Sequence, residues 1–207
     1  MGKEIEVKLA ASKKMLERIE KIEKVLHWNV EKKKEIHLVS HYFDTPGFNL
    51  LYNNLAYRVR EEDGRHIVTL KSNGKRRNGI YIREEKSDIL LDGEDITSSY
   101  YLEKHFPEVL EVSKGEPLSE VLTIDNNRHV LHLTNGDSLI EASLDFLYFI
   151  KGKRRIPYNE LELELKNGTE EELAECSSFL RLNYHLSLSG ASKYEMGLRS
   201  FNLIPLF

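Results

Sequence analysis

The sequence contains a single cysteine, Cys176, in 207 residues. One cysteine cannot form an internal disulfide, and it cannot supply the cysteine-rich ligand set of a structural zinc site. Long apolar runs are missing too, since no stretch approaches the roughly 20 residues that a membrane-spanning helix needs. The opening MGKEIEVKLA lacks the apolar core of a secretory signal. We therefore expect a reduced, cytoplasmic protein that does not enter a membrane.

An excess of either charge sign is also missing. The chain has 30 Lys and Arg against 34 Asp and Glu, for a formal net charge of -4, which argues against a general nucleic-acid binder. Eight histidines occur, but no HExxH or comparable ligand spacing joins them, so a zinc hydrolase is not expected. Without repeats, low-complexity runs or a linker, residues 1–207 are expected to form one α+β domain, acting as a monomer or homodimer.

Alternating or β-rich segments predict eight strands. Their approximate ranges are 3–10, 36–43, 55–62, 66–72, 79–85, 120–133, 139–147 and 158–166. Asp63-Gly64 predicts a hairpin between the third and fourth strands, whereas the basic stretch 71–79, with two Asn-Gly pairs, is expected to be a longer loop. Consecutive hairpins imply a mainly antiparallel meander.

Four segments are expected to be helical. Residues 12–26 place apolar side chains on one stripe, and Ser12 is a candidate N-cap. Residues 169–182 begin with the capping-box spacing of Thr169 and Glu172. The other two predicted helices are 97–106 and 192–201.

Nearly every predicted strand has one apolar and one strongly charged face. EIEVKLA, residues 4–10, alternates Glu4, Glu6 and Lys8 with apolar side chains. Acids are concentrated on the first, seventh and eighth predicted strands, whereas bases are concentrated on the third, fourth and fifth. Arginine is frequent among these bases. Its planar guanidinium is well suited to binding phosphate or carboxylate, which a surface that faces only water does not require.

Two arrangements can produce such faces. One is an open sheet with a charged side in water. The other is a closed barrel whose apolar face is covered by helices outside and whose charged face lies inside, which also removes the edge strands. Charges inside a barrel would need water, ions or a ligand, because unpaired buried charges are costly. A polyphosphate with Mg²⁺ or Mn²⁺ would satisfy both the bases and the acids.

The ordered motifs resemble the CYTH family, the triphosphate tunnel metalloenzymes, along nearly the whole chain. Glu4, Glu6 and Lys8 supply the family's opening E-x-E-x-K signature. Later segments match in order: HYFDTP at 41–46, YRVR at 57–60, TLK at 69–71, Arg83 with Glu85 as R-x-E, Asp145, Glu162 with Glu164 as E-x-E, and SKYEMGL at 192–198.

The resemblance implies a closed eight-stranded antiparallel β-barrel, a tunnel with a charged interior and helices packed outside. It also assigns the site residues; the alternating faces point independently to those on the strands, whereas Lys193 comes only from the SKYEMGL match. The predicted phosphate-binding residues are Arg58, Arg60, Lys71, Arg83 and Arg128. The predicted ligands of Mg²⁺ or Mn²⁺ are Glu4, Glu6, Asp145, Glu162 and Glu164. The residues predicted to assist catalysis are Lys8, Lys193 and Glu85. By strand alternation, Glu141 and Glu160 are expected to point to the same face as these acids.

Three functions are compatible with this pattern. The leading hypothesis is a metal-dependent hydrolase of inorganic triphosphate or of a small organic triphosphate such as thiamine triphosphate. The second is a class IV-type adenylyl cyclase, which would need a nucleotide pocket that the sequence does not reveal. The third is a polyphosphate- or nucleotide-binding protein without turnover, although the full set of acids argues against pure binding. Trp28 and the tyrosines are interpreted as packing residues rather than base-stacking platforms.

Overall fold

The computed structural model describes residues 2–62 and 64–205, and these residues form ten strands and six helices. The strands are β1 (Gly2–Ala10), β2 (Lys24–Val25), β3 (Trp28–Asp44), β4 (Ala56–Glu62), β5 (Arg65–Arg77), β6 (Ile80–Ile89), β7 (Ser119–Asn135), β8 (Ser138–Lys151), β9 (Arg154–Asn167) and β10 (Ser187–Leu188). The helices are α1 (Lys13–Ile19), α2 (Asn49–Tyr52), α3 (Ser99–His105), α4 (Pro107–Ser113), α5 (Glu170–Tyr184) and α6 (Lys193–Ser200).

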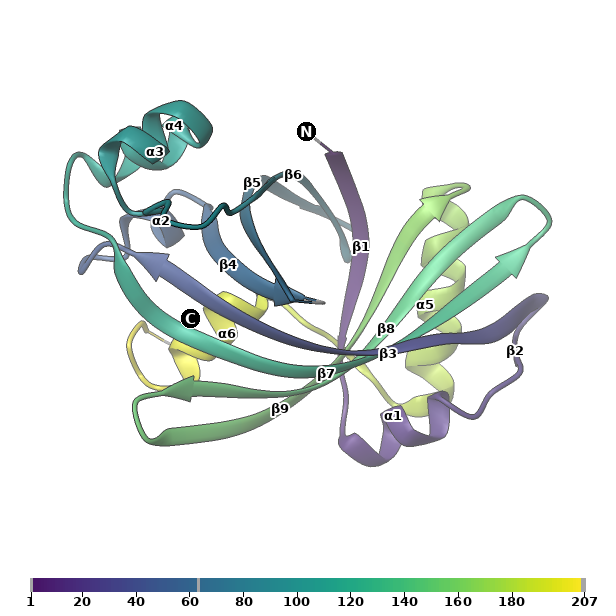
Figure 1. Cartoon of the computed structure of the whole chain (residues 1–207). Coiled ribbons are helices and arrows are strands. Elements are labelled where there is room, and N and C mark those ends of the chain that lie inside the picture. Colours follow the sequence, from purple (N-terminus) through teal and green to yellow (C-terminus); the bar gives the residue numbers. More distant parts are fainter. Residues whose placement is uncertain (1, 63, 206–207) are drawn as a thin grey trace.

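The eight long strands close into an antiparallel barrel (Figure 1). Hydrogen bonding runs in the order β1-β6-β5-β4-β3-β7-β8-β9, and β9 returns to β1. β1 can close the barrel because its first part pairs with β6 and its second part with β9; Glu6 lies opposite both Tyr81 and Glu164. The short β2 and β10 pair only at the margins, with β3 and β1. The predicted eight-stranded antiparallel barrel is confirmed.

The strand ends differ most from the predictions at two places, in β3 and β5. β3 begins at Trp28, eight residues before the predicted start, because it pairs with β7 along most of its length. The stretch 71–79 is not a long loop: β5 continues to Arg77, with a register shift between Ser72 and Lys75. The turn is made by Asn78 and Gly79, whose φ angles are 52° and 85°, as a tight hairpin requires. The β4–β5 hairpin is present, although Asp63 lies outside the described residues.

The helix predictions were partly correct. Ser12, Thr169 and Ser192 cap α1, α5 and α6, and the capping box of Thr169 with Glu172 is present. The prediction of one helix over 12–26 was wrong beyond Ile19, because Lys24–Val25 pairs with β3 and Leu26 has a φ of 54°. The prediction at 97–106 found α3 but missed α4, whose first residue is proline, as is common at helix starts. The four-residue α2 was missed as well.

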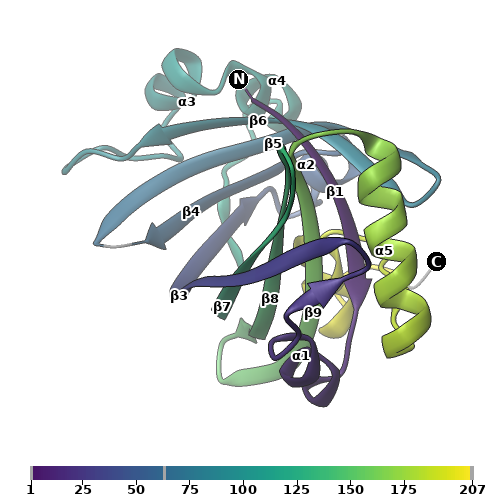
Figure 2. The same cartoon turned by 90° about the vertical axis from the view of Figure 1, so that its right-hand side faces the viewer.

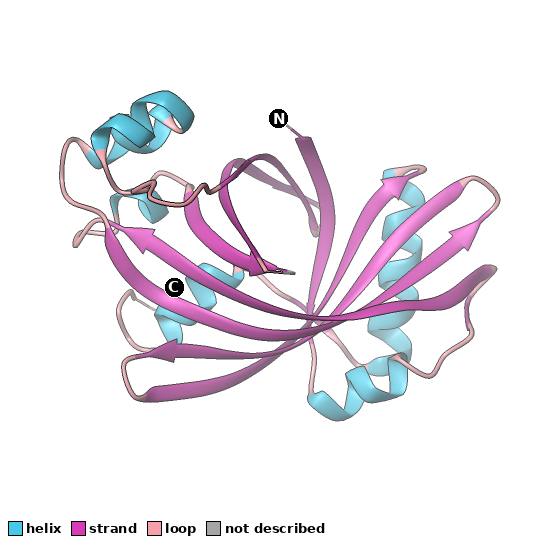
Figure 3. Cartoon of the chain, in the orientation of Figure 1, coloured by secondary structure: helices cyan, strands magenta, loops and turns pink. Residues whose placement is uncertain are grey.

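Helices cover the apolar outer face of the barrel (Figure 3). One core cluster lies beneath α1 and α5 (Figure 2) and includes Leu9, Leu144 and Leu163 from the strands. A second lies beneath α2, α3 and α4 and includes Tyr57 and Leu70. Burying these apolar side chains supplies the main driving force for the packing of helices on the barrel. Within the described residues, no helix has the length and apolarity needed to cross a membrane.

A third apolar cluster lies on the same strand face as the charged residues. Opposite residues in a sheet share a face, and Tyr42 lies opposite both Arg58 and Leu122. Helix α6 packs on this apolar end through side chains such as Leu198. The approach is close at Gly197, where a Cβ atom would lie 2.4 Å from Leu122 Cδ2. Because α6 packs here, the side chain of its first residue, Lys193, lies next to the charged part of the barrel.

Candidate functional site

A cavity of about 500 Å³ is enclosed by the inward faces of the barrel strands and the start of α6. All the predicted site residues line this cavity except Asp145. The Asp145 side chain is fully buried and contacts two residues of the cavity wall, Arg128 and Lys193. Strand alternation therefore brings together the predicted site residues of the strands, and α6 adds Lys193, whereas Glu141 and Glu160 are not part of the lining.

One group of ion pairs lies where β1, β5 and β6 meet. Lys71 Nζ lies 3.0 Å from both Glu4 carboxylate oxygens and 2.9 Å from Glu85 Oε2. Arg83 Nε donates to Glu4 Oε2 at 2.6 Å, and its Nη2 pairs with Glu6. Burial tends to raise the pKa of Glu4, but Lys71 and Arg83 hold this pKa well below its usual range. Glu4 is therefore a carboxylate under all ordinary conditions.

A second group lies on β7, β8 and β9. Arg128 binds Asp145 through two parallel hydrogen bonds of 2.7 Å, and its Nη2 donates a third to Glu162, also at 2.7 Å. Lys193, the first residue of α6, places its Nζ 2.9 Å from Asp145, 2.8 Å from Glu160 and 2.6 Å from Glu162. Three carboxylates therefore converge on one ammonium group.

The acids of the second group differ in their protonation behaviour. Burial alone would raise the pKa of Glu162, but Lys193, Lys8 and Arg128 bring this pKa well below its usual value. Burial dominates at Glu160, whose pKa is raised even though Lys193 opposes the shift. Glu160 is consequently the carboxylate of this group that binds a proton most readily.

Lys8 joins the two groups. Its Nζ lies 3.3 Å from Glu6 and 3.4 Å from Glu162, and the side chain is 2% exposed. β1 can provide this bridge because it pairs with β6 on one side and with β9 on the other. The closing strand thus links both sets of charges.

Arg58 and Arg60 on β4 have different surroundings. Within residues 2–62 and 64–205, neither guanidinium has a carboxylate salt-bridge partner: Arg58 Nη1 donates to the Tyr42 hydroxyl at 3.3 Å, and Arg60 Nε to Ser40 Oγ at 3.2 Å. Burial and the charges of Arg58 and Arg128 lower the pKa of Arg60 to about 10. This wall of the cavity carries positive charge that no carboxylate of the described residues contacts in a salt bridge, so it favours an anionic ligand.

Several polar residues of the site were missed by sequence reasoning. Tyr42 was interpreted as packing, yet it lines the cavity with its hydroxyl at Arg58. Asn126 Nδ2 donates to Asp145 Oδ1 at 2.8 Å. Each of them lies two positions along its strand from another residue that points into the barrel, and this alternation would have identified them. The remaining missed polar residues of the lining include Ser40, Ser87, Ser143, Lys166, Ser192 and Tyr194.

The acids around Lys193 have the donor chemistry that a hard divalent cation requires. Asp145, Glu160 and Glu162 already direct carboxylate oxygens to one cationic atom, Lys193 Nζ, at 2.6–2.9 Å. Oxygen-only donors of this kind match Mg²⁺ or Mn²⁺ rather than softer metals. Glu164, another predicted ligand, also lines the cavity; it pairs with Lys166 at 2.7 Å, and burial raises its pKa.

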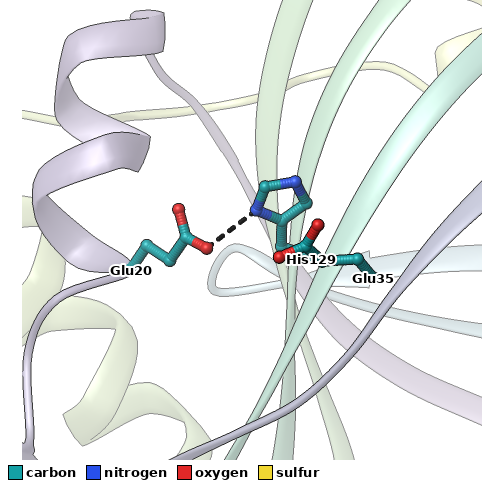
Figure 4. A group of neighbouring side chains, drawn as sticks. All are labelled: Glu20, Glu35 and His129. Carbon is teal, nitrogen blue, oxygen red and sulfur yellow. Dashed lines mark hydrogen bonds and ion pairs between the residues drawn. The ribbon is translucent and has the colours of Figure 1, made fainter.

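Another group of potential metal ligands lies outside the cavity lining. One ligand atom each of Glu20, Glu35 and His129 falls within 4.8 Å of the others (Figure 4). His129 Nδ1 lies 2.9 Å from Glu20 Oε1. Lys32 already places its ammonium 2.8 Å from Glu20 and 2.6 Å from Glu35. We interpret this group as an ion-pair network that joins α1 to the barrel.

Comparison with known proteins identifies the class. The sequence matches the CYTH domain model over residues 2–197. The chain belongs to the CYTH family.

The chain is also similar in sequence to a curated protein and in fold to solved structures. An inorganic triphosphatase of Haemophilus influenzae is 29% identical over 197 residues, covering 95% of this chain and 54% of that protein. The chain thus spans about half the length of this curated relative. An adenylyl cyclase candidate of Hippeastrum, described as having a dominant triphosphatase activity, has a TM-score of 0.65 at 20% identity, with 98% of each chain covered. An adenylate cyclase candidate of Bacillus halodurans has a TM-score of 0.57 at 20% identity, covering 97% of this chain and 99% of that one.

Proposed function

We propose that the protein is a metal-dependent triphosphatase that hydrolyses inorganic triphosphate or a small organic triphosphate. The observation that carries the proposal is a cavity with two kinds of wall. Arg58 and Arg60 have no carboxylate salt-bridge partner among the described residues, and Asp145, Glu160 and Glu162 converge on Lys193 at the cavity wall. The relative from Haemophilus influenzae, an inorganic triphosphatase, supports the same chemistry.

In this proposal the basic side chains hold the triphosphate. Arg58 and Arg60 bind its oxygens first, because neither guanidinium has to leave a carboxylate salt-bridge partner among the described residues. Lys71, Arg83 and Arg128 contribute further positive charge from neighbouring strands, so that charge developing on the transferred phosphoryl group is stabilised. No covalent nucleophile is needed, because positioning and electrostatics supply most of the catalysis of phosphoryl transfer.

The acids complete the site. Asp145 and Glu162, with Glu160 beside them, would hold Mg²⁺ or Mn²⁺, and Glu4 and Glu6 extend the acidic wall along β1. Such an ion, when bound, neutralises phosphate oxygens and orients the phosphate chain. Lys8 and Lys193 keep the carboxylates in place through their ion pairs. Glu85 is available to orient the attacking water by hydrogen bonding.

A product assay tests the proposal. The protein is incubated with inorganic triphosphate, thiamine triphosphate and ATP, each with Mg²⁺, with Mn²⁺ and with EDTA. We expect metal-dependent release of phosphate. Cyclic AMP with pyrophosphate would instead assign a cyclase, and tight triphosphate binding without any product would assign a binding protein.

A variant pair excludes a contaminating phosphatase. Arg58→Gln removes a charge from the basic wall and should lower turnover by about 10²-fold or more, the usual cost of losing one electrostatic contact to a transition state. Arg65→Gln removes an arginine that is exposed at the start of β5, and it should leave turnover unchanged. Equal activity of both variants would contradict the assignment of the cavity as the active site.

A further inference from the structure

Three polar side chains stand in a row on neighbouring strands, close to the turn between β7 and β8. His132 on β7 lies directly opposite Glu141 on β8, and Glu141 lies directly opposite Glu164 on β9. On its other side, Glu164 lies opposite Glu6 of β1. Side chains in opposite positions share one face of a sheet, and like charges placed there destabilise it. Glu164 therefore stands between two acids, and its position requires a cation nearby.

Lys166, two residues further along β9, supplies this cation. Its Nζ lies 2.7 Å from Glu164 Oε1 and 3.8 Å from Glu141 Oε1. Among the residues that the structure describes, Glu164 has no other salt-bridge partner. The charge of Glu164 is therefore compensated by one flexible side chain.

Glu164 differs in this respect from the other acids that the sequence predicts to bind a divalent ion. Each of the others pairs with at least two cationic side chains: Glu4, Glu6, Asp145 and Glu162. The lysines among those cations are enclosed, since Lys8 is 2% exposed and Lys193 is 11% exposed, whereas Lys166 is 37% exposed. An exposed lysine is held weakly by its partner and has a flexible stem, so it exchanges partners readily. Glu164 is thus the predicted ligand whose cation is most easily displaced.

Both members of the pair line the charged cavity. An ammonium group binds a phosphate oxygen as well as it binds a carboxylate, because both are anionic acceptors. A phosphate chain in the cavity would therefore offer Lys166 a second partner. The departure of Lys166 would leave the Glu164 carboxylate without its cation, and free carboxylate oxygens are the ligands that Mg²⁺ and Mn²⁺ prefer.

We propose that Lys166 is an exchangeable counter-ion of Glu164. Its ammonium group neutralises Glu164 in the free protein and moves to a phosphate oxygen when the substrate enters, which frees Glu164 to bind Mg²⁺ or Mn²⁺. This inference rests on the proposed function, because it assumes that the cavity takes a phosphate chain and a divalent ion. Its consequence is a coupling between the two ligands, since each favours the state of the Lys166–Glu164 pair that the other requires.

Calorimetric titration of the substrate-free protein with Mn²⁺ tests the inference without turnover. Lys166→Gln removes the competing ammonium group, so Mn²⁺ should bind about three- to tenfold more tightly than to the wild type. A salt bridge that served only the fold would predict equal or weaker binding. In turnover assays at saturating Mn²⁺, the KM of Lys166→Gln for triphosphate should rise about threefold or more, because the substrate loses a cationic contact.

Two controls separate this exchange from a general change in charge. Lys3 also lines the cavity and is exposed, but it has no carboxylate salt-bridge partner among the described residues, so Lys3→Gln should bind Mn²⁺ within about twofold of the wild type. Glu164→Gln should weaken Mn²⁺ binding. Adding Lys166→Gln to Glu164→Gln should then change the affinity by less than about twofold, because the coupled partner is gone.

The outcomes distinguish this inference from the proposed function. If the wild type hydrolyses no triphosphate with either ion, the proposed function fails. If the wild type is a metal-dependent triphosphatase but Lys166→Gln binds Mn²⁺ no more tightly than the wild type, only this inference fails. It fails as well if Lys3→Gln tightens binding equally, or if Lys166→Gln still tightens binding in the Glu164→Gln protein. Tighter binding that requires Glu164 supports the inference, even where the wild type binds Mn²⁺ too weakly to measure.

Discussion

Arg128 binds the fully buried carboxylate of Asp145 through two parallel hydrogen bonds of 2.7 Å, from directly opposite positions on β7 and β8. The pair is largely buried and lies at the wall of the charged cavity. Its geometry makes Asp145 a structural member of the barrel as well as a proposed metal ligand. This double role has a measurable consequence for stability.

Asp145→Asn should lower both activity and stability. The substitution leaves Arg128 and Lys193 with less compensating charge, and breaking a buried ion pair costs about 3–5 kcal/mol. Urea unfolding followed by circular dichroism measures the loss. Asp125→Asn is the control, because Asp125 pairs with the half-exposed Arg155 and should lose no more than about 1 kcal/mol. Equal losses for the two variants would contradict the prediction.

Arg60→Gln should separate activity from stability. Its guanidinium has no carboxylate salt-bridge partner among the described residues, and its lowered pKa of about 10 shows that the surroundings disfavour its charge. The variant should therefore be at least as stable as the wild type, while kcat/KM for triphosphate should fall by about 10²-fold. Thermal unfolding and steady-state kinetics measure the two effects. A large loss of stability would show that Arg60 supports the fold.

Gly197→Ala should displace α6. The added Cβ would lie 2.4 Å from Leu122 Cδ2 and 3.0 Å from Phe149 Cδ1, and such overpacking costs about 1–3 kcal/mol. Because Lys193 is in the same helix, turnover should fall together with the unfolding temperature. Gly74→Ala is the control, since its Cβ would meet no atom within 4 Å. A Gly197→Ala variant with normal stability and turnover would contradict the close packing.

Cys176 should be unreactive in the folded protein. Burial, together with Glu175 and Glu172, raises the pKa of its thiol to about 12, and the side chain is fully buried in the core under α5. Because its pKa is raised, the thiol stays protonated, and the reactive thiolate is scarce up to strongly alkaline pH. Iodoacetamide should therefore modify Cys176 at pH 8 only after denaturation. Rapid modification of the native protein would contradict this packing.

Much of the fold was predictable because β-strands alternate strictly. The spacing of two in Glu4, Glu6 and Lys8, or in Arg58 and Arg60, fixes which side chains share a face, wherever the strand is placed. The caps Ser12, Thr169 and Ser192 act on the next few backbone N–H groups, so they were also visible locally. Strand and helix ends were less predictable: β3 is extended by its pairing with β7, and α1 ends where β2 pairs with β3.

The sequence by itself determined the two faces of each strand, the separation of acids from bases and the positions of most turns, because each depends on residues close together in the chain. Only the tertiary structure decided the partners. Closure of β1 on β9 lets Lys8 bridge Glu6 and Glu162, and the docking of α6 gives Asp145 a second cation, Lys193. It also places Tyr194 against Tyr42. These contacts depend on how the barrel closes, and no local spacing encodes that.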